Sequence, residues 1–327
     1  MRVLVTGATG CVGANVAAAL CEAGYTVRAL HRPTSTMEAL AGLDVEPIEG
    51  DLFDLPALQR AMTDCALVFH VAAVSDYWRT PTETIYRVNV EGTRQVVSAA
   101  QHARVERLVY TSSVGALGVP PAGRMLDERD TFNLSPQRFP YGHSKHLAEE
   151  VVRAAVSQGL DAVIVNPAAV IGPRDIHWIG GSLLREVQRG QGWFAPPGGT
   201  CWAAASDVGK GHLLAALHGR KGERYILGGE NITHRRMLEI VAEVVGQRPP
   251  WVTLPRWLMD PLALLVRGLS RLRPHLLPLS AEQVWLSARQ VYCDSRRARE
   301  ELGYTTIPLH TAVEQAYGWY RERGLLE

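Results

Sequence analysis

A tyrosine and a lysine four residues apart form the part of this sequence that is best suited to acid–base chemistry. They lie in the segment YGHSK, where a helix would place Tyr141 and Lys145 on one face and within reach of each other. The phenol of tyrosine has a pKa of about 10 in water, and a neighbouring ammonium group lowers that pKa by favouring the phenolate. We therefore expect Tyr141 to exchange a proton with a substrate oxygen. The alternative is a surface pair on an amphipathic helix.

Two serines upstream offer a hydroxyl group that could orient a carbonyl. Ser112 and Ser113 follow the β-branched run 108–110 in the segment TSSVGALG. Ligands of open α/β sheets bind at this carboxyl edge of the strands. Successive side chains of a strand point to opposite faces, so only one of the two serines should face such a site. We expect Ser113 to do so, with Ser112 as the alternative.

Three glycines with the spacing GxxGxxG directly follow the first apolar run of the chain. Gly7, Gly10 and Gly13 separate that run from an apolar helical segment. Glycine permits a tight turn and lets a pyrophosphate approach backbone N–H groups at a helix N-terminus. The position of the motif at the start of a strand–helix–strand unit predicts a dinucleotide-binding turn. The residues expected to line this turn are Gly7, Thr9, Gly10, Cys11, Val12 and Gly13.

The end of the second apolar run selects between the two nicotinamide dinucleotides. A carboxylate there would hold the ribose hydroxyls of NAD, whereas a guanidinium accommodates the extra phosphate of NADP. The segment VRALHRPTS contains no Asp or Glu, and Arg32 could bind a phosphate with help from Thr34 or Ser35. We expect NADP(H), with NAD(H) and a merely solvated Arg32 as the alternative. Asp51 and Leu52 follow the third run where an adenine would lie, although an aspartate also caps helices.

These motifs stand on a chain that alternates β-branched runs with amphipathic segments. Strands are expected at Val3–Val5, Val27–Leu30, Val45–Ile48, Leu67–Val71, Leu108–Tyr110 and Ala162–Val165. Helices are expected at Val12–Ala23, Pro56–Met62, Val88–Gln101 and Tyr141–Gln158. Strand and helix in alternation predict an α/β fold with a Rossmann-type, doubly wound parallel sheet covered on both faces.

The alternating rhythm ends after Pro173, where Trp-, Pro- and Gly-rich loops begin. We expect a dinucleotide-binding Rossmann domain over residues 1–173. Residues 174–327 should form mainly a smaller, mostly helical substrate lobe, with helices beginning near Ile232 and Pro255. Some of its segments should return to the sheet, because the run YIL at 225–227 reads as a strand.

Composition excludes several classes of protein. The 327 residues are 46% hydrophobic and carry 34 Lys+Arg against 33 Asp+Glu, a balance that argues against a nucleic-acid surface. The first apolar run is too short for a secretory signal, and the apolar region 257–272 contains three charged residues, so no membrane span is expected. Five scattered cysteines favour neither a metal site nor disulfides. We expect a cytoplasmic protein that acts on a small molecule.

The glycine motif, the serine and the YxxxK pair, in this order, resemble the extended short-chain dehydrogenase/reductase family, within the NAD-dependent epimerase/dehydratase superfamily. The resemblance covers nearly the whole chain and includes HVAA at 70–73, NVEGT at 89–93 and NPAAVIGP at 166–173. VRALHRPTS, VFHVAA, TSSVGALG and ERYILGGEN are similar to the dihydroflavonol 4-reductase-like group, and more closely to its hopanoid-associated sugar epimerase subgroup. One segment departs from the family pattern, since AASDVG at 204–209 lacks a valine–histidine lead, which leaves the pocket wall undefined.

The resemblance also implies roles for individual residues. Ser113, Tyr141 and Lys145 would be catalytic, Lys145 would also hold the nicotinamide ribose, and Arg32 would select NADPH. Four further residues would line the cofactor, namely Ala72, Ala73, Pro167 and Val170. Family members often dimerise through two helices, which makes a homodimer through Val88–Gln101 and Tyr141–Gln158 an expectation here.

The substrate site should combine an aromatic wall with few polar groups, which suits an apolar or ring-bearing carbonyl compound. Its candidate residues are Ser75, Asp76, Tyr77, Trp78, Val114, Trp178, Trp193 and Phe194. For each tryptophan the alternative is a place in the lobe core. The apolar segment 255–267 could pack on the lobe, cover the pocket as a lid or lie against a membrane.

Three functions compete on this basis. The first is an NADP(H)-dependent reductase of an aldehyde or ketone. The second is a nucleotide-sugar epimerase or dehydratase that recycles its NAD(P), and the third is a non-enzymatic, cofactor-sensing module. A sugar diphosphate would need cations, and the candidates in the lobe are Arg185, Arg189, Arg235, Arg236, Arg267, Arg271 and Arg289.

Overall fold

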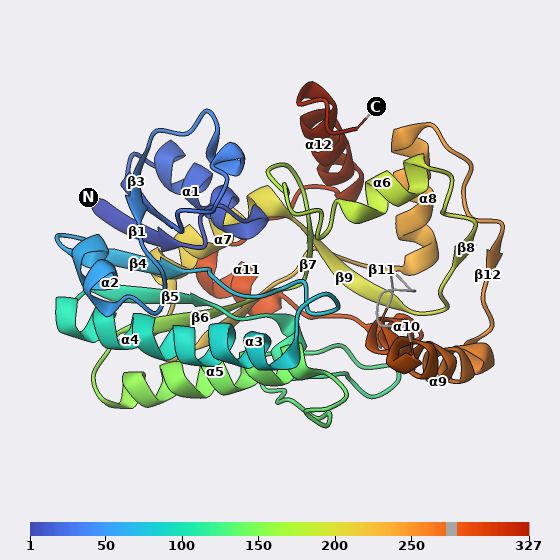
Figure 1. The fold of residues 1–327 in the computed structure, drawn as a ribbon, viewed down its shortest axis with the longest axis horizontal. Helices are drawn as coiled ribbons and strands as arrows, with labels where there is room; N and C mark the ends of the chain where they lie inside the picture. Colours follow the sequence, from blue (N-terminus) through green and yellow to red (C-terminus); the bar gives the residue numbers. More distant parts are fainter. Residues whose placement is uncertain (273–279, 327) are drawn as a thin grey trace.

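A seven-stranded parallel sheet forms the centre of the molecule (Figure 1). The computed structural model describes residues 1–272 and 280–326. The strand order is β10-β6-β5-β4-β1-β2-β3, which confirms the predicted doubly wound architecture. The strands are β1 (Arg2–Thr6), β2 (Thr26–His31), β3 (Val45–Glu49), β4 (Leu67–His70), β5 (Arg107–Thr111), β6 (Ala162–Pro167) and β10 (Arg224–Leu227).

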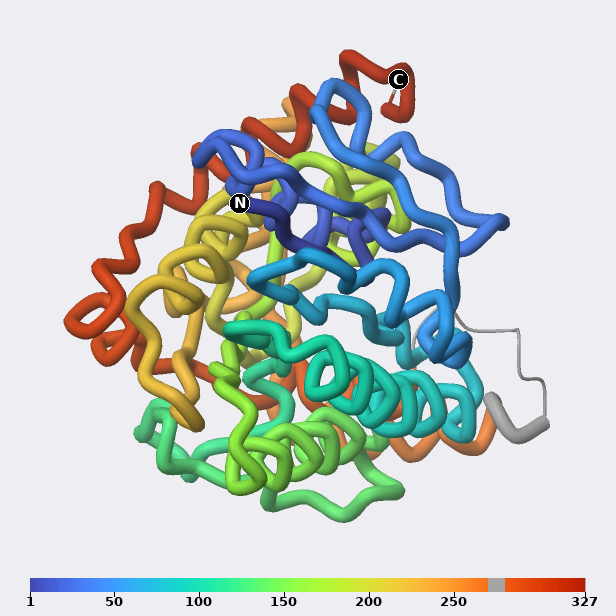
Figure 2. Tube along the Cα trace, turned by 90° about the vertical axis from the view of Figure 1, so that its left-hand side faces the viewer, coloured from blue at the N-terminus to red at the C-terminus, as the bar shows by residue number. Residues whose placement is uncertain are grey.

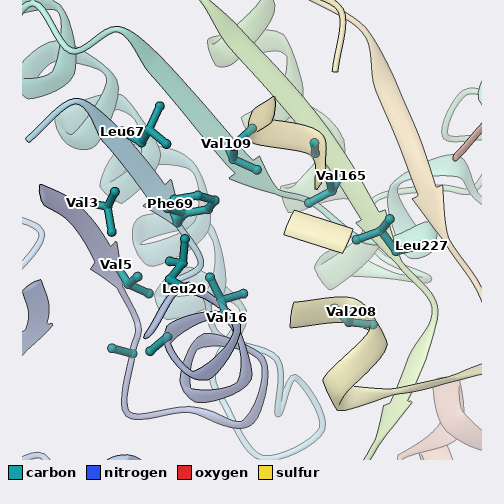
Figure 3. Packing of buried hydrophobic residues seen from close by; sticks show 14 of the residues in the cluster. Val3, Val5, Val16, Leu20, Leu67, Phe69, Val109, Val165, Val208 and Leu227 are labelled. Atoms are coloured by element: carbon teal, nitrogen blue, oxygen red, sulfur yellow. The ribbon is translucent and has the colours of Figure 1, made fainter. Parts of the chain in front are cut away.

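Helices cover both faces of this sheet, which is why its strands are apolar throughout. In β1, Val3 and Val5 join the buried cluster on one face, whereas Leu4 joins the cluster on the other (Figure 3). The first face is covered by α1 (Cys11–Glu22) and α7 (Ala205–His218). The second face is covered by α2 (Leu55–Met62), α4 (Gly92–Ala103) and α5 (Pro140–Ser157).

The helix predicted at Val88–Gln101 is longer than expected and is interrupted. It begins with α3 (Thr82–Tyr86), widens into a π-helical turn at Arg87–Glu91 (η2) and continues as α4. Such wide turns inside helices occur frequently at functional sites. Here the wide turn contains Asn89, whose side chain reaches the loop that follows β4.

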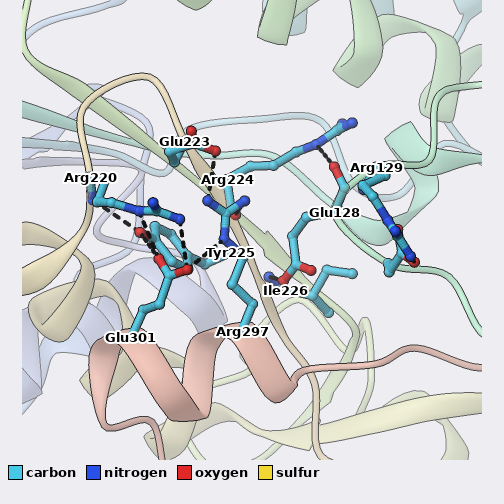
Figure 4. Close-up of polar contacts among 10 residues, drawn as sticks. Glu128, Arg129, Arg220, Glu223, Arg224, Tyr225, Ile226, Arg297 and Glu301 are labelled. Atoms are coloured by element: carbon cyan, nitrogen blue, oxygen red, sulfur yellow. Dashed lines mark hydrogen bonds and ion pairs between the residues drawn. The ribbon is translucent and has the colours of Figure 1, made fainter.

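The strand expected at 225–227 does return to the sheet as β10 and pairs in parallel with β6. As an edge strand it would present unpaired backbone groups. The carboxylate of Glu128 covers this edge, because its Oε1 accepts the N–H of Ile226 at 3.0 Å (Figure 4). Arg224 holds the same loop by donating to the carbonyl oxygens of Glu128 and Asp130. Arg297 of α11 (Arg296–Leu302) pairs with Glu223 just before β10.

The remaining segments form a second lobe with its own core. Its helices are α6 (Ser182–Gln188), α8 (His234–Val245), α9 (Arg256–Leu272), α10 (Ala281–Ser287) and α12 (Leu309–Glu322). The sequence reading missed its short strands, which are β7 (Ala169–Ile171), β8 (Phe194–Ala195), β9 (Gly199–Ala204), β11 (Glu230–Thr233), β12 (Val252–Thr253) and β13 (Gln290–Val291). In Figure 2, α7 (yellow) lies beside the red C-terminal part of the chain, where α11 contacts α7. None of the described helices is both long and apolar enough to span a bilayer.

Candidate functional site

The glycine turn between β1 and α1 is shaped by backbone contacts. Gly7 has a φ of +68°, and a Cβ atom there would lie 2.6 Å from the backbone of Ala72. A Cβ on Gly13 would collide with the carbonyl oxygen of Gly7. At Gly10, by contrast, the nearest atom is the Gly7 oxygen, 3.6 Å away, and Gly10 caps the start of α1. The turn is therefore packed on two sides and open at the helix N-terminus, which fits a pyrophosphate.

The buried His70, at the end of β4, binds the residue that precedes the glycine turn. His70 accepts from the hydroxyl of Thr6 at Nδ1 (2.8 Å), and its Nε2 lies 3.0 Å from Oγ1 of Thr93. Thr93 in turn donates to the carbonyl of Asn89 at 2.6 Å, so it can accept the Nε2–H of His70. Burial lowers the pKa of His70 to about 3, and Lys145 adds to this shift. The ring is therefore neutral at physiological pH.

The same hydrogen-bond chain continues to the helix that carries Tyr141. The amide of Asn89 binds both backbone groups of Val74 and donates to Oγ of Ser144 at 3.0 Å. Ser144 donates to the carbonyl oxygen of Tyr141 at 2.7 Å. The glycine turn and the start of α5 are thus held in one buried network.

The end of β2 presents an arginine to solvent. The side chain of Arg32 is exposed and forms no hydrogen bond or salt bridge with the described part of the chain. Its carbonyl accepts from Ser35, which turns the loop containing Thr34 and Ser35 back toward it. Asp51 accepts the N–H of Phe53 at the end of β3. A phosphate beside β2 would meet this guanidinium.

Ser113 and Ser112 point in different directions, as alternation requires. The hydroxyl of Ser113 lies near that of Tyr141 and lowers the pKa of the phenol, and Oγ of Ser113 also accepts the N–H of Gly115 at 3.1 Å. Ser112 is buried and donates to Oε1 of Glu149 at 2.6 Å. The pair that could meet a carbonyl oxygen is therefore Ser113 and Tyr141.

Lys145 lies on the same helix face as Tyr141 but does not act on it as expected. Its Nζ donates to the carbonyl of Thr111 at 2.6 Å and lies 4.6 Å from the ring centre of Tyr110. The pKa of Tyr141 is raised by burial, and the Ser113 hydroxyl offsets this only in part. The expectation of a phenol pKa lowered by the ammonium was wrong for this structure, because the ammonium is directed to the Thr111 carbonyl. Burial lowers the pKa of Lys145 itself to about 7.

A buried carboxylate, which the sequence analysis missed, ties helix α5 to β6, to β10 and to the residue that follows β5. Glu149 is 1% exposed, and its Oε2 accepts from Arg224 of β10 at 3.0 Å. Its Oε1 accepts from Ser112 after β5 and from Asn166 of β6, at 2.6 and 2.7 Å. Asn166 also donates to the carbonyl of Ser113. The available signal was its position four residues after Lys145, on the same helix face.

An aromatic cluster lies against Tyr141. The ring of Tyr77 stacks on that of Tyr141, with centroids 5.3 Å apart, and contacts the rings of Trp78 and Phe139 edge-on. Val114 is buried beside Ser113 in a short 3-10 turn, η3 (Val114–Leu117). Asp76, which accepts from Thr80, precedes the cluster in the chain. Tyr77 and Trp78 are therefore brought to Tyr141, and Phe139 joins them without having been predicted.

The two lobe tryptophans lie elsewhere. Trp178 stacks on Tyr320 with ring centroids 4.2 Å apart and packs against the lobe core. Trp193 is 61% exposed and stacks on Trp251. Neither ring contacts the Tyr141 cluster within the described ranges.

The other predicted residues flank the glycine turn. Cys11 and Val12 begin α1, Thr9 precedes them, and Sγ of Cys11 lies 3.8 Å from the carbonyl of Pro173. Five of the seven candidate phosphate-binding arginines are engaged elsewhere: Arg185 over Trp178, Arg235 and Arg236 with Glu239, Arg267 with Glu282 and Arg289 with Asp260. The side chain of Arg271 lies outside the described residues. Leu52 is buried, Ala72 and Ala73 follow β4, and Pro167 and Val170 lie in β6 and β7.

Known proteins are similar to this chain in sequence and in fold. The model of the NAD dependent epimerase/dehydratase family matches residues 3–228. A dihydroflavonol 4-reductase-like protein of Synechocystis sp. is 37% identical over 99% of this chain and 95% of its own length. Sterol demethylase protein B of Methylococcus capsulatus is 35% identical over the whole of both chains. The solved structure of a nucleoside-diphosphate-sugar epimerase from Pseudomonas aeruginosa is 28% identical, covers 100% of this chain and 99% of its own, and superimposes with a TM-score of 0.83.

Proposed function

We propose, because this chain belongs to the NAD dependent epimerase/dehydratase family, that it is an NADP(H)-dependent oxidoreductase that reduces an aldehyde or ketone. The observation that carries this proposal is Arg32, an exposed and unpaired guanidinium directly after β2, where NADP places its additional phosphate. The bound nicotinamide would supply a hydride. The relatives named for dihydroflavonol and sterol chemistry support an apolar ring compound as substrate.

We assign the proton to Tyr141 and the orientation of the carbonyl to Ser113. Their hydroxyl groups lie near each other, so one substrate oxygen placed between them could accept from both. The raised pKa of Tyr141 keeps the phenol protonated, which is the form a reductase needs at this position. Lys145 lies one turn along α5, where it would hold the nicotinamide ribose. Tyr77, Trp78 and Phe139 would form the apolar wall of the substrate site.

We further assign the dinucleotide to residues 1–173, which also supply the wall formed by Tyr77, Trp78 and Phe139, and we propose that residues 174–327 complete the substrate site. The Thr6 end of β1, the start of α1 and the end of β2 meet at the carboxyl edge of the sheet, as in other open α/β sheets. The segments α7 and β10 belong by sequence to the second part but complete the sheet layer of the first.

The first test measures net oxidation of NADPH with a panel of aromatic, aliphatic and terpenoid carbonyl compounds. We expect turnover with at least one ring-bearing ketone or aldehyde, and a loss of about 10²–10⁴-fold in Tyr141→Phe, which removes the proton donor. His102→Gln, an exposed substitution, serves as the control. If no compound is reduced while a nucleotide sugar is converted without net change in cofactor, the chain is an epimerase or dehydratase. A function that survives Tyr141→Phe would instead indicate a cofactor-sensing module.

The second test measures cofactor affinity by titration. Arg32→Ala should weaken NADPH binding by about 10–100-fold, the value of a charge-assisted phosphate contact, and leave NADH binding nearly unchanged. Arg129→Ala, which removes a guanidinium that is 91% exposed and lies far along the chain, should alter neither affinity. Equal binding of NADH and NADPH by the unmodified protein would contradict the assignment, as would a cofactor that copurifies and does not exchange.

A further inference from the structure

Large apolar side chains gather on one exposed face of the second lobe. Of the eleven exposed large hydrophobic residues among those described, seven come from α9, from β8 and β12, and from the residue directly before each of these two strands. We call this surface the apolar lobe face; it consists of Trp193, Phe194, Trp251, Val252, Trp257, Leu264 and Leu265. The three elements lie together at one end of the lobe (Figure 1). A concentration of this kind marks an interaction surface.

Helix α9 is apolar on both of its sides. Met259, Ala263 and Val266 face inward and pack with Val284 of α10. Trp257, Leu264 and Leu265 face outward and are 76%, 67% and 58% exposed, with Pro261 exposed between them. Their spacing of seven and eight residues places them on one stripe of the helix. Packing on α10 therefore leaves Trp257, Leu264 and Leu265 exposed.

A second group of exposed apolar side chains lies on the paired strands β8 and β12 and directly before them. Trp193 and Trp251 stack in parallel with centroids 6.3 Å apart and are 61% and 73% exposed. The N–H of Trp251 donates to the carbonyl of Trp193, which fixes the pair to the backbone. Tryptophan rings are favoured where a protein meets the interface between water and a bilayer.

Three arginines that are close in the chain to the apolar lobe face have no acidic partner among the described residues. Arg189, Arg248 and Arg256 are exposed and form no salt bridge within the described ranges. The neighbouring carboxylate of Asp260 is held by Arg289 at 3.5 Å. In a two-fold contact with a second copy the same surface would face itself, and its arginines would repel each other. Anionic headgroups complement them instead.

We propose that the apolar lobe face docks this protein onto an anionic phospholipid surface. The tryptophans and leucines would enter the boundary between headgroups and acyl chains, while the three arginines contact phosphates. The inference goes beyond the proposed function and does not depend on it, since docking requires no reaction. It explains why Trp257, Leu264 and Leu265 of α9 are apolar although they are exposed.

The test is flotation of the purified chain with vesicles of phosphatidylcholine, with or without an equal share of phosphatidylglycerol. We expect flotation with the anionic vesicles and a blue shift of tryptophan fluorescence. The double substitution Leu264→Ser and Leu265→Ser should reduce binding by about tenfold or more, because it removes apolar area that enters the membrane. Arg248→Gln and Arg256→Gln should each weaken binding to anionic vesicles by about fivefold and leave binding to neutral vesicles unchanged.

The control is Leu217→Ser, which removes an exposed leucine of α7 outside the apolar lobe face and should bind as the unmodified chain does. Thermal unfolding verifies that each variant is folded, and cofactor titration reports on the other site. Failure of the unmodified chain to float with anionic vesicles would overturn the proposal. It would also be overturned if the leucine pair changed the oligomeric state by light scattering and left flotation unaltered, since the surface would then join two copies.

Discussion

Glu149 is the residue on which the geometry around Tyr141 depends most. It neutralises Arg224 and receives hydrogen bonds from Ser112 and Asn166, all within a region that excludes water. A buried charge that loses its partner is costly, because nothing replaces the lost interaction. This carboxylate therefore links stability to the arrangement of the strand ends near Tyr141.

We expect Glu149→Gln to lower the free energy of unfolding by about 3–5 kcal/mol, since it leaves the Arg224 guanidinium buried without a carboxylate. Urea unfolding measures the change. Glu150→Gln, on the exposed side of α5, should cost no more than about 0.5 kcal/mol. Equal losses of unfolding free energy in the two variants would show that the buried Glu149–Arg224 pair stabilises the fold no more than an exposed carboxylate does.

At this scale the sequence was informative where a motif has a fixed local geometry. Tyr141 and Lys145 share a helix face as their spacing required, and Ser113 and Ser112 alternate as a strand end requires. It did not reveal where the Lys145 ammonium points, because the Thr111 carbonyl that receives it comes from another element. The ion pair between Glu149 and Arg224 could not be predicted for the same reason, since 75 positions separate the two residues.

At the scale of elements, the contact between β1 and α1 leaves no room for side chains in the glycine turn. Gly13 lies against the carbonyl of Gly7, and both are backbone atoms that cannot rotate away. The helix must therefore move if a Cβ atom is added. At the neighbouring Gly10 an added Cβ atom would meet only the Gly7 oxygen at 3.6 Å, so this side of the turn has room that Gly13 lacks.

Gly13→Ala should displace the start of α1, weaken dinucleotide binding by at least about tenfold and destabilise the fold by about 1–3 kcal/mol. Thermal unfolding and cofactor titration measure the two effects. Gly318→Ala in α12 is the matched control, because nothing lies within 4 Å of its added Cβ. It should stabilise the chain by up to about 1 kcal/mol through helix propensity. A Gly13→Ala variant that binds cofactor normally would contradict the packing argument.

Elements with strong periodicity were predictable, and short ones were not. The strands of the large sheet and the helices α1, α2 and α5 were expected within one or two residues of their bounds. The strands β8, β12 and β13 have two residues each, too few for an alternating pattern. β8 and β12 pair with each other and β13 pairs with β9, so each depends on a partner that is distant in the sequence.

For the whole molecule, buried neutral histidines make stability depend on pH. His70 and His212 have pKa values lowered by burial to about 3 and about 4, compared with about 6.5 in an unfolded chain. Between these limits the unfolded chain binds protons that the folded chain excludes. The free energy of unfolding is therefore highest above pH 6.5 and falls as the pH drops toward 4, by about 1.4 kcal/mol per pH unit for each histidine.

His212→Gln should reduce that slope by the share of one histidine, whatever its effect on stability at neutral pH. Urea midpoints measured at a series of pH values from 7 to 4 (roughly the titration range of histidine) give the slope. His102→Gln, which removes an exposed histidine on α4, should leave the slope unchanged. A slope that is identical in all three proteins would place the acid sensitivity in carboxylates instead.

The return of β10 to the edge of the sheet has a consequence for how the chain is made. A ribosome releases β6 well before β10, because β7, β8, β9 and α7 are synthesised between them. Until residue 227 has emerged, the outer edge of β6 and the side of α1 that α7 covers remain open to water. The nascent chain thus exposes the unpaired backbone groups of β6 throughout synthesis of the segment between β6 and β10. A fragment that stops at residue 173 should accordingly aggregate or be degraded in a cell, even though it contains the complete dinucleotide motif.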